Sequence, residues 1–299
     1  MRTPFTGVGT ALVSPFTRGG SLDEAAVRRL GRRQIEAGVH FLCPCGTTGE
    51  SPTLTDAEKV RTVEILVEEA KGRVPILAGA GGYDTKEVMH LADEMKKAGA
   101  SGLLSVTPYY NKPSQEGLYQ HYRAIAEHTS LPIVVYNVPG RTGVNVEVGT
   151  LVRLAELPNI VGVKEASGNV TQMCEICRAV PPDFLVLSGD DALTLPLMAV
   201  GGRGIISVAG NEIPSEMVQM VEAAERNDFA AARQIHVRIV PLLLANFIEA
   251  NPIPVKAAMA AMGLLEDVYR LPMVPAQKAS LEKLQTVLRE LGLLKGALV

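Results

Sequence analysis

Residues 132–165 read PIVVYNVPGRTGVNVEVGTLVRLAELPNIVGVKE and contain one complete strand–helix–strand unit. Apolar, β-branched runs at 132–136 and 160–164 predict two strands, and the segment between them predicts a helix over 146–156. A break rich in Pro and Gly separates the first strand from the helix. Because both strand runs are almost continuously apolar, we expect parallel strands that are buried on both faces.

The same pattern recurs on both sides of this unit. Further strands are predicted at 7–13, 40–43, 75–78, 102–106, 184–188 and 204–207. Further helices are predicted at 22–37, 56–70, 86–98, 115–127, 170–179, 192–200 and 215–225. Two of these helices start near capping-box sequences, Ser21-x-x-Glu24 and Thr55-x-x-Glu58, in which two backbone N–H groups are satisfied reciprocally.

Eight strands that alternate with eight helices predict an α/β protein built as a closed (β/α)8 TIM barrel. The count alone leaves an open, doubly wound sheet as an alternative. We assign residues 1–228 to the barrel, which carries the active site. Residues 229–299 contain no strand-like run and predict a C-terminal helical domain, interrupted at 251–254 and 271–272, where subunit contacts are natural.

The composition argues against several classes of protein. The 299 residues carry a net charge of -3 and no basic stripe with interleaved aromatics, which argues against a nucleic-acid partner. The N-terminal residues lack the long apolar run of a secretory signal. The apolar stretch 239–248 is far below the roughly 20 residues needed to cross a bilayer. We therefore expect a cytoplasmic enzyme that does not contact a membrane.

The four cysteines stand as Cys43-x-Cys45 and Cys174-x-x-Cys177. Such pairs can bind zinc or form a redox couple, but they can also be reduced thiols packed in the interior. The spacing lacks the zinc-ribbon context that would complete a set of ligands. We therefore expect reduced thiols and no metal site.

Barrel enzymes keep their active sites at the C-terminal ends of the strands, and four of those ends carry polar groups here. The residue of greatest interest is Lys164, which ends the run 160–164 and shares a face with Gly162, a residue that would leave room beside it. Burial disfavours the charged ammonium, and a neutral amine can attack a ketone to form an imine. The alternative is a surface lysine paired with a glutamate.

Tyr136 ends the neighbouring strand, so its phenol should lie close enough to Lys164 to move protons. The Thr48 hydroxyl can both donate and accept, and could link two tyrosines into a relay. Taken singly, Tyr136 or Tyr110 could equally be an amphipathic filler of the core.

Gly46 and Gly49 flank two threonines, which permits a tight loop whose N–H groups face a carboxylate. Arg141 lies in a Pro-Gly-Arg-Thr-Gly loop and could bind a second carboxylate, although loop arginines are often simply solvated. Asp190 and Asp191 are interpreted as N-caps of the following helix.

Five segments together resemble the dihydrodipicolinate synthase and N-acetylneuraminate lyase superfamily, and the resemblance spans essentially the whole chain. They are GTTGES (46–51), TPYYNKP (107–113), YNVPGRTG (136–143), GVKEASG (162–168) and SGDD (188–191). Five matches in the same order, on the expected strands, are far more specific than any one of them. The resemblance implies a pyruvate-dependent lyase that requires no metal or organic cofactor.

The resemblance also implies roles for individual residues. Lys164 would form the imine with pyruvate, Thr47 with neighbouring amides would hold the pyruvate carboxylate, and Gly189 and Ile206 would line the pyruvate end of the pocket through backbone contacts. Tyr136, Thr48 and Tyr110 would form the proton relay, with Tyr110 reaching in from the neighbouring subunit. Arg141 would bind the carboxylate of aspartate semialdehyde.

The product implied by the resemblance is hydroxytetrahydrodipicolinate, which opens lysine and diaminopimelate biosynthesis. The implied assembly is a homotetramer built from two tight dimers. In feedback-inhibited relatives, lysine binds at the dimer interface. The corresponding positions here are of two kinds: Ser51, Glu87 and Tyr109 match the inhibited type, whereas Asp56, Lys59 and Tyr83 replace its two histidines and asparagine. We therefore expect weak or absent inhibition by lysine.

Two alternatives remain open. The first is another pyruvate aldolase of the superfamily, such as an N-acetylneuraminate lyase or a 2-keto-3-deoxy sugar acid aldolase. Arg141 and the Tyr109-Tyr110 pair favour the semialdehyde, because a small carboxylate substrate needs a cation where sugars need hydroxyl-binding groups. The second is a catalytically silent barrel that binds pyruvate or amino acids as a regulator. Such proteins usually lose the lysine or the relay.

Overall fold

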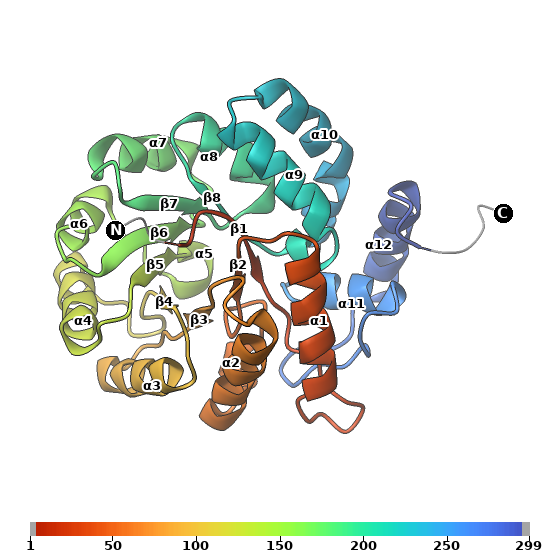
Figure 1. Ribbon diagram of the computed structural model, residues 1–299, viewed down its shortest axis with the longest axis horizontal. Helices are drawn as coiled ribbons and strands as arrows, with labels where there is room; N and C mark the ends of the chain where they lie inside the picture. The colour runs from red at the N-terminus through yellow and green to blue at the C-terminus, as the bar shows by residue number, and fades with distance from the viewer. Residues whose placement is uncertain (1–3, 295–299) are drawn as a thin grey trace.

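The computed structural model describes residues 4–294 and confirms the predicted (β/α)8 barrel (Figure 1). Its eight parallel strands are β1 (Gly7–Ala11), β2 (Phe41–Cys43), β3 (Leu77–Gly79), β4 (Gly102–Val106), β5 (Ile133–Asn137), β6 (Ile160–Glu165), β7 (Leu185–Ser188) and β8 (Gly204–Ser207). The sheet runs β2-β1-β8-β7-β6-β5-β4-β3. A parallel bridge between Leu42 and Ile76 joins its two ends, and the Leu42 N–H donates to the Pro75 carbonyl at 3.0 Å. The sheet therefore closes, which excludes the open doubly wound alternative.

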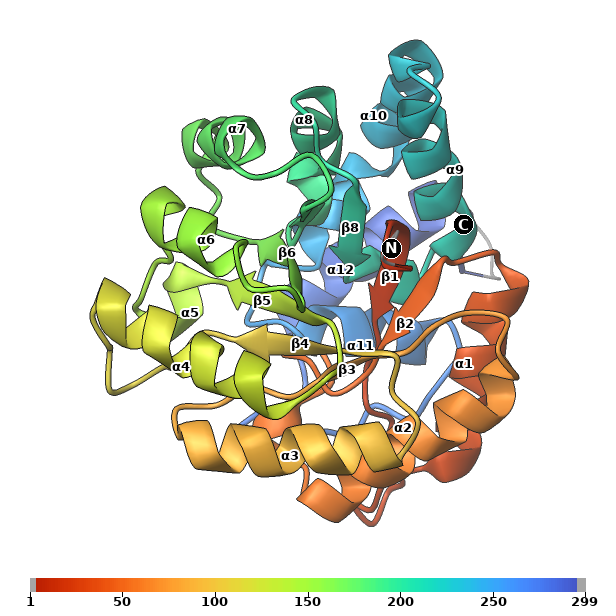
Figure 2. The same ribbon diagram turned by 60° about the vertical axis from the view of Figure 1, so that its left-hand side comes forward.

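Helices form a ring around the strands, as both ribbon views show (Figures 1 and 2). The ring consists of α1 (Glu24–Glu36), α2 (Asp56–Ala70), α3 (Thr85–Lys97), α4 (Gln115–His128), α6 (Val148–Leu154), α7 (Val170–Ala179), α8 (Thr194–Ala199) and α9 (Pro214–Glu225). A short helix, α5 (Pro139–Thr142), follows β5 and was not predicted. The C-terminal part holds α10 (Phe229–Ala245), α11 (Ile253–Ala261) and α12 (Lys278–Glu290).

One predicted capping box is confirmed and one is wrong. Thr55 caps α2 reciprocally with Glu58, as expected. At α1 the cap is Asp23, whose carboxylate accepts the Ala26 N–H at 2.9 Å, so the helix starts at Glu24 and not at 22. Leu22 is instead held in extended backbone by an antiparallel bridge to Phe16. Because this bridge fixes Leu22 outside the helix, Asp23 is placed better than Ser21 to accept from the first turn of α1.

The alternation of side chains along the strands creates two apolar layers. Residues facing outward pack beneath the helices, whereas those facing inward fill the barrel. The inner layer begins at the N-terminal end with Phe5 and Phe41, whose rings meet edge to face at 5.6 Å. A Cβ on Gly9 would come within 2.2 Å of the Phe41 Cζ, so glycine is what admits this ring. The N-terminal end of the barrel is thus filled by side chains, and space for a ligand is expected at the C-terminal ends of the strands.

The predicted helical character of the C-terminal part is confirmed by α10, α11 and α12. Helix α11 packs on the barrel: Val255 and Met259 form one apolar cluster with Val13, Leu30 and Val208. The C-terminal helices therefore bring residues to the mouth of the barrel. The domain boundary at 228/229 stays a prediction.

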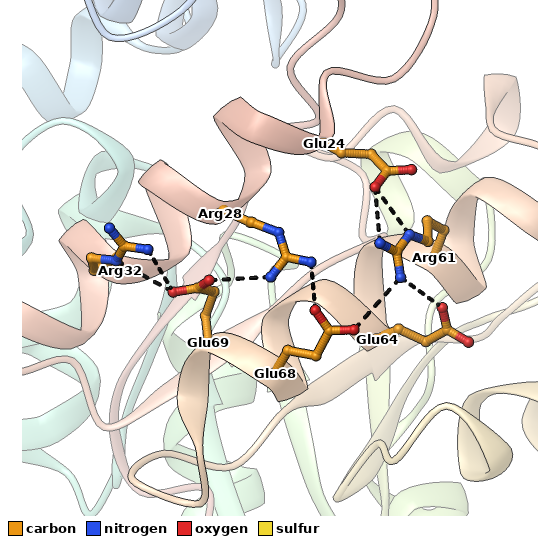
Figure 3. Close-up of polar contacts among 7 residues, drawn as sticks. All are labelled: Glu24, Arg28, Arg32, Arg61, Glu64, Glu68 and Glu69. Carbon is orange, nitrogen blue, oxygen red and sulfur yellow. Dashed lines mark hydrogen bonds and ion pairs between the residues drawn. The ribbon is translucent and has the colours of Figure 1, made fainter.

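A ladder of ion pairs connects the outer faces of α1 and α2 (Figure 3). Arg28 pairs with Glu68 and with Glu69, the latter at 3.2 Å, and Arg61 pairs with Glu24 at 3.0 Å. Arg32 and Glu64 extend the ladder at its two ends. Most of these side chains are a third to a half exposed, so screening leaves each pair little stabilising effect.

Candidate active site

The site centres on Lys164, which lies near the end of β6 and is 4% exposed. In the register of β5 and β6, Lys164 is the direct cross-strand partner of Tyr136. The Lys164 Nζ lies over the Tyr136 ring, 4.1 Å from its centre, and Tyr136 is 6% exposed. The sequence prediction that these two groups are neighbours at the barrel mouth is confirmed, because adjacent parallel strands in register bring their ends together.

Glu165, the next residue, lies on the opposite face of β6. Its carboxylate accepts from Asn137 Nδ2 at 2.9 Å and from the Ser167 N–H at 2.8 Å. The carboxylate therefore belongs to a polar network outside the barrel. The alternative of a surface lysine paired with a glutamate is accordingly wrong for Lys164, which is buried and faces the lumen.

Space for the lysine comes from Gly189 in the loop after β7. A Cβ on Gly189 would lie 3.1 Å from Lys164 Cε and 2.6 Å from the Ala166 Cβ. Gly162, which we expected to leave this room, faces the neighbouring strand instead, where a Cβ would meet the Leu185 carbonyl oxygen at 2.6 Å. Ile206 lies in the buried inner layer of the barrel together with Tyr136. Gly189 thus lies beside the lysine, while contact of Gly189 and Ile206 with a substrate remains a proposal.

The loop 46–49 after β2 is closed by two overlapping turns. The Gly49 N–H donates to the Gly46 carbonyl at 3.1 Å, and the Glu50 N–H donates to the Thr47 carbonyl at 3.1 Å. Thr47 lines a cavity at the barrel mouth. Thr48 is buried, and its Oγ1 accepts from Asn251 Nδ2 at 3.0 Å. The loop therefore presents one threonine to the cavity and anchors the other in the interior.

Arg141 lies on α5, directly after β5, and lines the same cavity. Its Nη2 donates to the Asn251 carbonyl at 3.2 Å, while the rest of the side chain is exposed. Asn251 thus contacts both Thr48 and Arg141, and its own Oδ1 is buried without a hydrogen-bond partner. Sequence reasoning missed Asn251, because the run 251–254 was interpreted only as an interruption between helices.

The cavity has a volume of about 340 Å³. Its walls come from the loops after β2, β3, β4 and β5 and from two C-terminal segments that include Asn251 and Met273. Tyr136 forms part of the wall on the β5 side. The cavity thus joins the predicted carboxylate loop, the predicted cation Arg141 and the phenol beside Lys164 in one space.

The two tyrosines after β4 lie in different surroundings. Tyr109 lines the cavity and packs edge to face on Tyr83 at 5.2 Å, and burial raises the pKa of Tyr109. Tyr110 is 91% exposed and has a positive φ of 68°. In the single chain Tyr110 points to solvent, so its contribution to a relay needs a neighbouring subunit.

Only some of the residues at the positions of the lysine-binding site of inhibited relatives line the cavity. Ser51, Lys59 and Tyr109 line the cavity, whereas Glu87 is exposed on α3. Lys59 Nζ pairs with Asp56 at 2.9 Å. The side chain of Lys59 therefore places a positive charge of the protein itself in the wall of the cavity.

The four cysteines are free thiols. Burial raises the pKa of Cys43 and that of Cys45 to about 12, so both stay protonated at neutral pH. Cys177 is half-buried, and Cys174 is exposed, contrary to the expectation of an interior thiol. Within residues 4–294, no three His, Cys, Asp or Glu side chains are grouped as metal ligands would be. Asp190 caps the turn after β7, as predicted, by accepting the Ala192 N–H at 2.9 Å. The same prediction is wrong for Asp191, whose carboxylate accepts from the Ser207 hydroxyl and from the N–H groups of Val208 and Ala209.

Comparison with known proteins places these features in context. Residues 4–291 match the model of the dihydrodipicolinate synthetase family. The 4-hydroxy-tetrahydrodipicolinate synthase of Koribacter versatilis is 53% identical over 294 residues, 98% of each chain. The crystal structure of dihydrodipicolinate synthase from Thermotoga maritima superposes with a TM-score of 0.96 at 47% identity, covering 97% of this chain and 100% of the other. A monomeric dihydrodipicolinate synthase variant also gives 0.96 at 47% identity, with 98% of both chains covered. Across the part of the chain that the structure describes, no helix is long and apolar enough to span a membrane.

Proposed function

The chain belongs to the dihydrodipicolinate synthetase family, and from that premise we propose that it is a lyase that condenses pyruvate with L-aspartate 4-semialdehyde. The product is hydroxytetrahydrodipicolinate, and the reaction is the first committed step of diaminopimelate and lysine biosynthesis. The observation that carries this proposal is the buried amine of Lys164 over the ring of Tyr136. Tyr136 in turn lines the cavity together with Thr47 and Arg141. The relatives' names favour this reaction over cleavage of sialic or sugar acids and over a silent binding role.

The first half of the reaction uses pyruvate alone. Thr47 and the N–H groups of the 46–49 loop hold its carboxylate, while Gly189 and Ile206 line the pyruvate end of the pocket through backbone contacts. Neutral Lys164 attacks the keto carbon, and the carbinolamine loses water to give a protonated imine. This imine draws electrons from the methyl group, a methyl proton leaves, and an enamine forms. Tyr136 supplies and removes protons, with Thr48 and Tyr110 completing the relay.

The second half consumes the semialdehyde. Arg141 binds its carboxylate through a charge-assisted contact and so places the aldehyde beside the enamine. The enamine carbon bonds to the aldehyde carbon, whose oxygen takes up a proton. The amine of the semialdehyde then attacks the imine carbon and displaces Lys164, which closes the ring. Every step uses side chains and substrates only, without a metal or an organic cofactor.

The assembly belongs to the same proposal, a homotetramer of two tight dimers in which each partner supplies Tyr110. Tyr110 is 91% exposed and does not line the cavity of its own chain, which fits a residue that serves a neighbouring subunit. The biosynthetic role supports a cytoplasmic location.

A comparison of substrates tests the proposed function. Purified protein is given pyruvate with aspartate semialdehyde in one assay and sialic acid in another. We expect turnover with the semialdehyde at least about 100-fold faster than cleavage of sialic acid, since the sugar aldehyde that sialic acid releases carries no carboxylate for Arg141 to bind. Faster cleavage of sialic acid would assign the chain to another aldolase of the superfamily.

A further inference from the structure

Behind the 46–49 loop lies a buried ion pair that the proposed chemistry does not use. Lys256, on α11, is 0% exposed, and Glu50, which directly follows the loop, is 3% exposed. Lys256 Nζ lies 2.5 Å from Glu50 Oε1. The rings of Phe16 and Tyr269 cover the same ammonium, with centres 4.4 and 4.8 Å away. This pair links residues 206 positions apart in the sequence.

The contacts of Lys256 converge on the loop from two directions. Besides Glu50, its Nζ donates to the Ser14 carbonyl at 3.0 Å. The Ser14 hydroxyl in turn donates to the Gly49 carbonyl at 2.7 Å. One ammonium therefore fixes Gly49 through Ser14 and Glu50 directly. These are the residues at which the two turns of the loop end.

The backbone of Glu50 needs such support. Its φ is 53°, in the left-handed region that residues other than Gly, Asn and Asp seldom occupy. In that conformation its N–H closes the turn on the Thr47 carbonyl. If the side chain were free, the backbone would relax toward commoner conformations and Thr47 would move with it.

Stability alone is a weak explanation for the pair. Burying two charges costs about as much as their attraction returns, and apolar side chains of similar size are often as stable. Burial lowers the pKa of Lys256, and the Glu50 carboxylate opposes that lowering. The opposite charges of the pair largely cancel, although Glu50 borders the cavity. The contacts that the pair makes with Ser14 and the loop therefore point to an effect on the geometry of the loop.

We propose that the Lys256–Glu50 pair is a positioning device that holds the 46–49 loop in the shape that receives the pyruvate carboxylate. The inference rests on the proposed function, because it assigns the carboxylate of pyruvate to this loop. Lys256 and Glu50 are positioning residues: Glu50 borders the cavity, but its carboxylate is taken up by Lys256. Their loss should weaken pyruvate binding while leaving the semialdehyde contact at Arg141 intact.

The test uses Glu50→Gln, which keeps the shape and one acceptor but removes the charge. Borohydride trapping at increasing pyruvate gives the half-saturating concentration without the second substrate, and steady-state assays give both KM values. We expect the half-saturating concentration and the KM for pyruvate to rise about tenfold. A tenfold change is about what the loss of one hydrogen bond to a charged group causes. Trapping at saturating pyruvate and the KM for the semialdehyde should stay within about twofold of the wild type.

Two further variants keep the result interpretable. Glu50→Gln with Lys256→Met removes both charges together, so it should fold and show the same selective shift even where Lys256→Met alone does not fold. Glu212→Gln is the control for a buried Glu-to-Gln change away from the loop, because Glu212 is similarly buried and accepts from Asn246 Nδ2 at 2.5 Å. It should leave half-saturation by pyruvate unchanged.

The proposal is overturned when Glu50→Gln and the double variant, both folded, keep half-saturation within twofold of the wild type. It is also overturned when both KM values rise together, as general loosening would cause. A wild-type protein that forms no pyruvate adduct at all would overturn the proposed function as well. The two failures are therefore distinguishable.

Discussion

The amine of Lys164 lies over the face of the Tyr136 ring, 4.1 Å from its centre, and the two residues are direct cross-strand partners. An aromatic face attracts an ammonium more strongly than a neutral amine. Imine formation exchanges this contact for a covalent bond to substrate, and the phenol is left beside the reacting atoms.

Removal of the Tyr136 hydroxyl should separate binding from chemistry. Tyr136→Phe keeps the ring over Lys164 but loses the proton donor. We expect kcat to fall roughly 100-fold or more, since general acid–base catalysis typically contributes that much. The yield of borohydride-trapped pyruvate at saturation should be retained. Tyr119→Phe is the control, because Tyr119 lies on the ring helix α4, where its aromatic ring packs under the guanidinium of Arg153 from α6. A kcat for Tyr136→Phe within about twofold of the wild type would remove the phenol from the mechanism.

Tyr110 should act across a subunit interface. Tyr110→Ala and Lys164→Ala chains are each expected to be nearly inactive. After unfolding and refolding as a mixture, hybrid dimers contain one site with an intact Lys164 and the partner's Tyr110. Activity that neither variant has alone should therefore appear, as measured by the coupled assay on the mixed sample. If mixing restores nothing although hybrid dimers form, Tyr110 is not supplied by the partner.

Lysine should inhibit weakly or not at all. Lys59 already places a cation in the cavity wall that also contains Ser51 and Tyr109, and Glu87 does not line this cavity. Half-inhibition below about a millimolar would require roughly 4 kcal/mol of specific contacts. A titration of the condensation rate with lysine checks this expectation. Inhibition in the micromolar range would show that the three substitutions had not removed the site.

Acid should weaken the attachment of the C-terminal segment. Hydrogen bonds from Arg270 lower the pKa of Glu58 to about 2, from an ordinary value near 4.5. The ionised form is favoured in the folded protein, so this stabilisation is present above about pH 4.5 and is lost as the pH falls toward 2. The shift corresponds to at most about 3 kcal/mol at neutral pH.

Unfolding by urea at pH 7 and pH 3 measures this effect. Glu58→Gln should be clearly less stable than the wild type at pH 7, and about half or more of that difference should disappear at pH 3. Glu64→Gln, from an exposed ion pair with Arg61, should change stability by less than about 1 kcal/mol at either pH. An equal difference for Glu58→Gln at both pH values would contradict the assignment.

Much of the architecture could be predicted from the sequence because buried parallel strands leave unbroken apolar runs. The ends of those strands must meet at one edge, so Lys164, Tyr136 and the 46–49 loop could be placed together before any coordinates were known. The glycine that admits the lysine was predicted less well. Alternation along β6 puts Gly162 on the same face as Lys164, but the space beside the lysine comes from Gly189 in the loop after β7.

The contacts made by the C-terminal helices could not be predicted. Asn251 reaches Thr48 across 203 residues, and no local periodicity or cap announces such a contact. The Lys256–Glu50 pair is of the same kind: a lysine on an apolar helix looks like a solvated charge until the fold buries it. Long-range polar contacts of this type depend on packing and not on propensity.

The most direct test of the central claim is borohydride reduction of the wild-type protein with pyruvate, followed by peptide mapping. We expect one stable adduct per chain, located on Lys164, and Lys164→Ala should neither trap pyruvate nor condense it with the semialdehyde at a measurable rate. An adduct on another lysine, or undiminished condensation by Lys164→Ala, would contradict imine catalysis at this site.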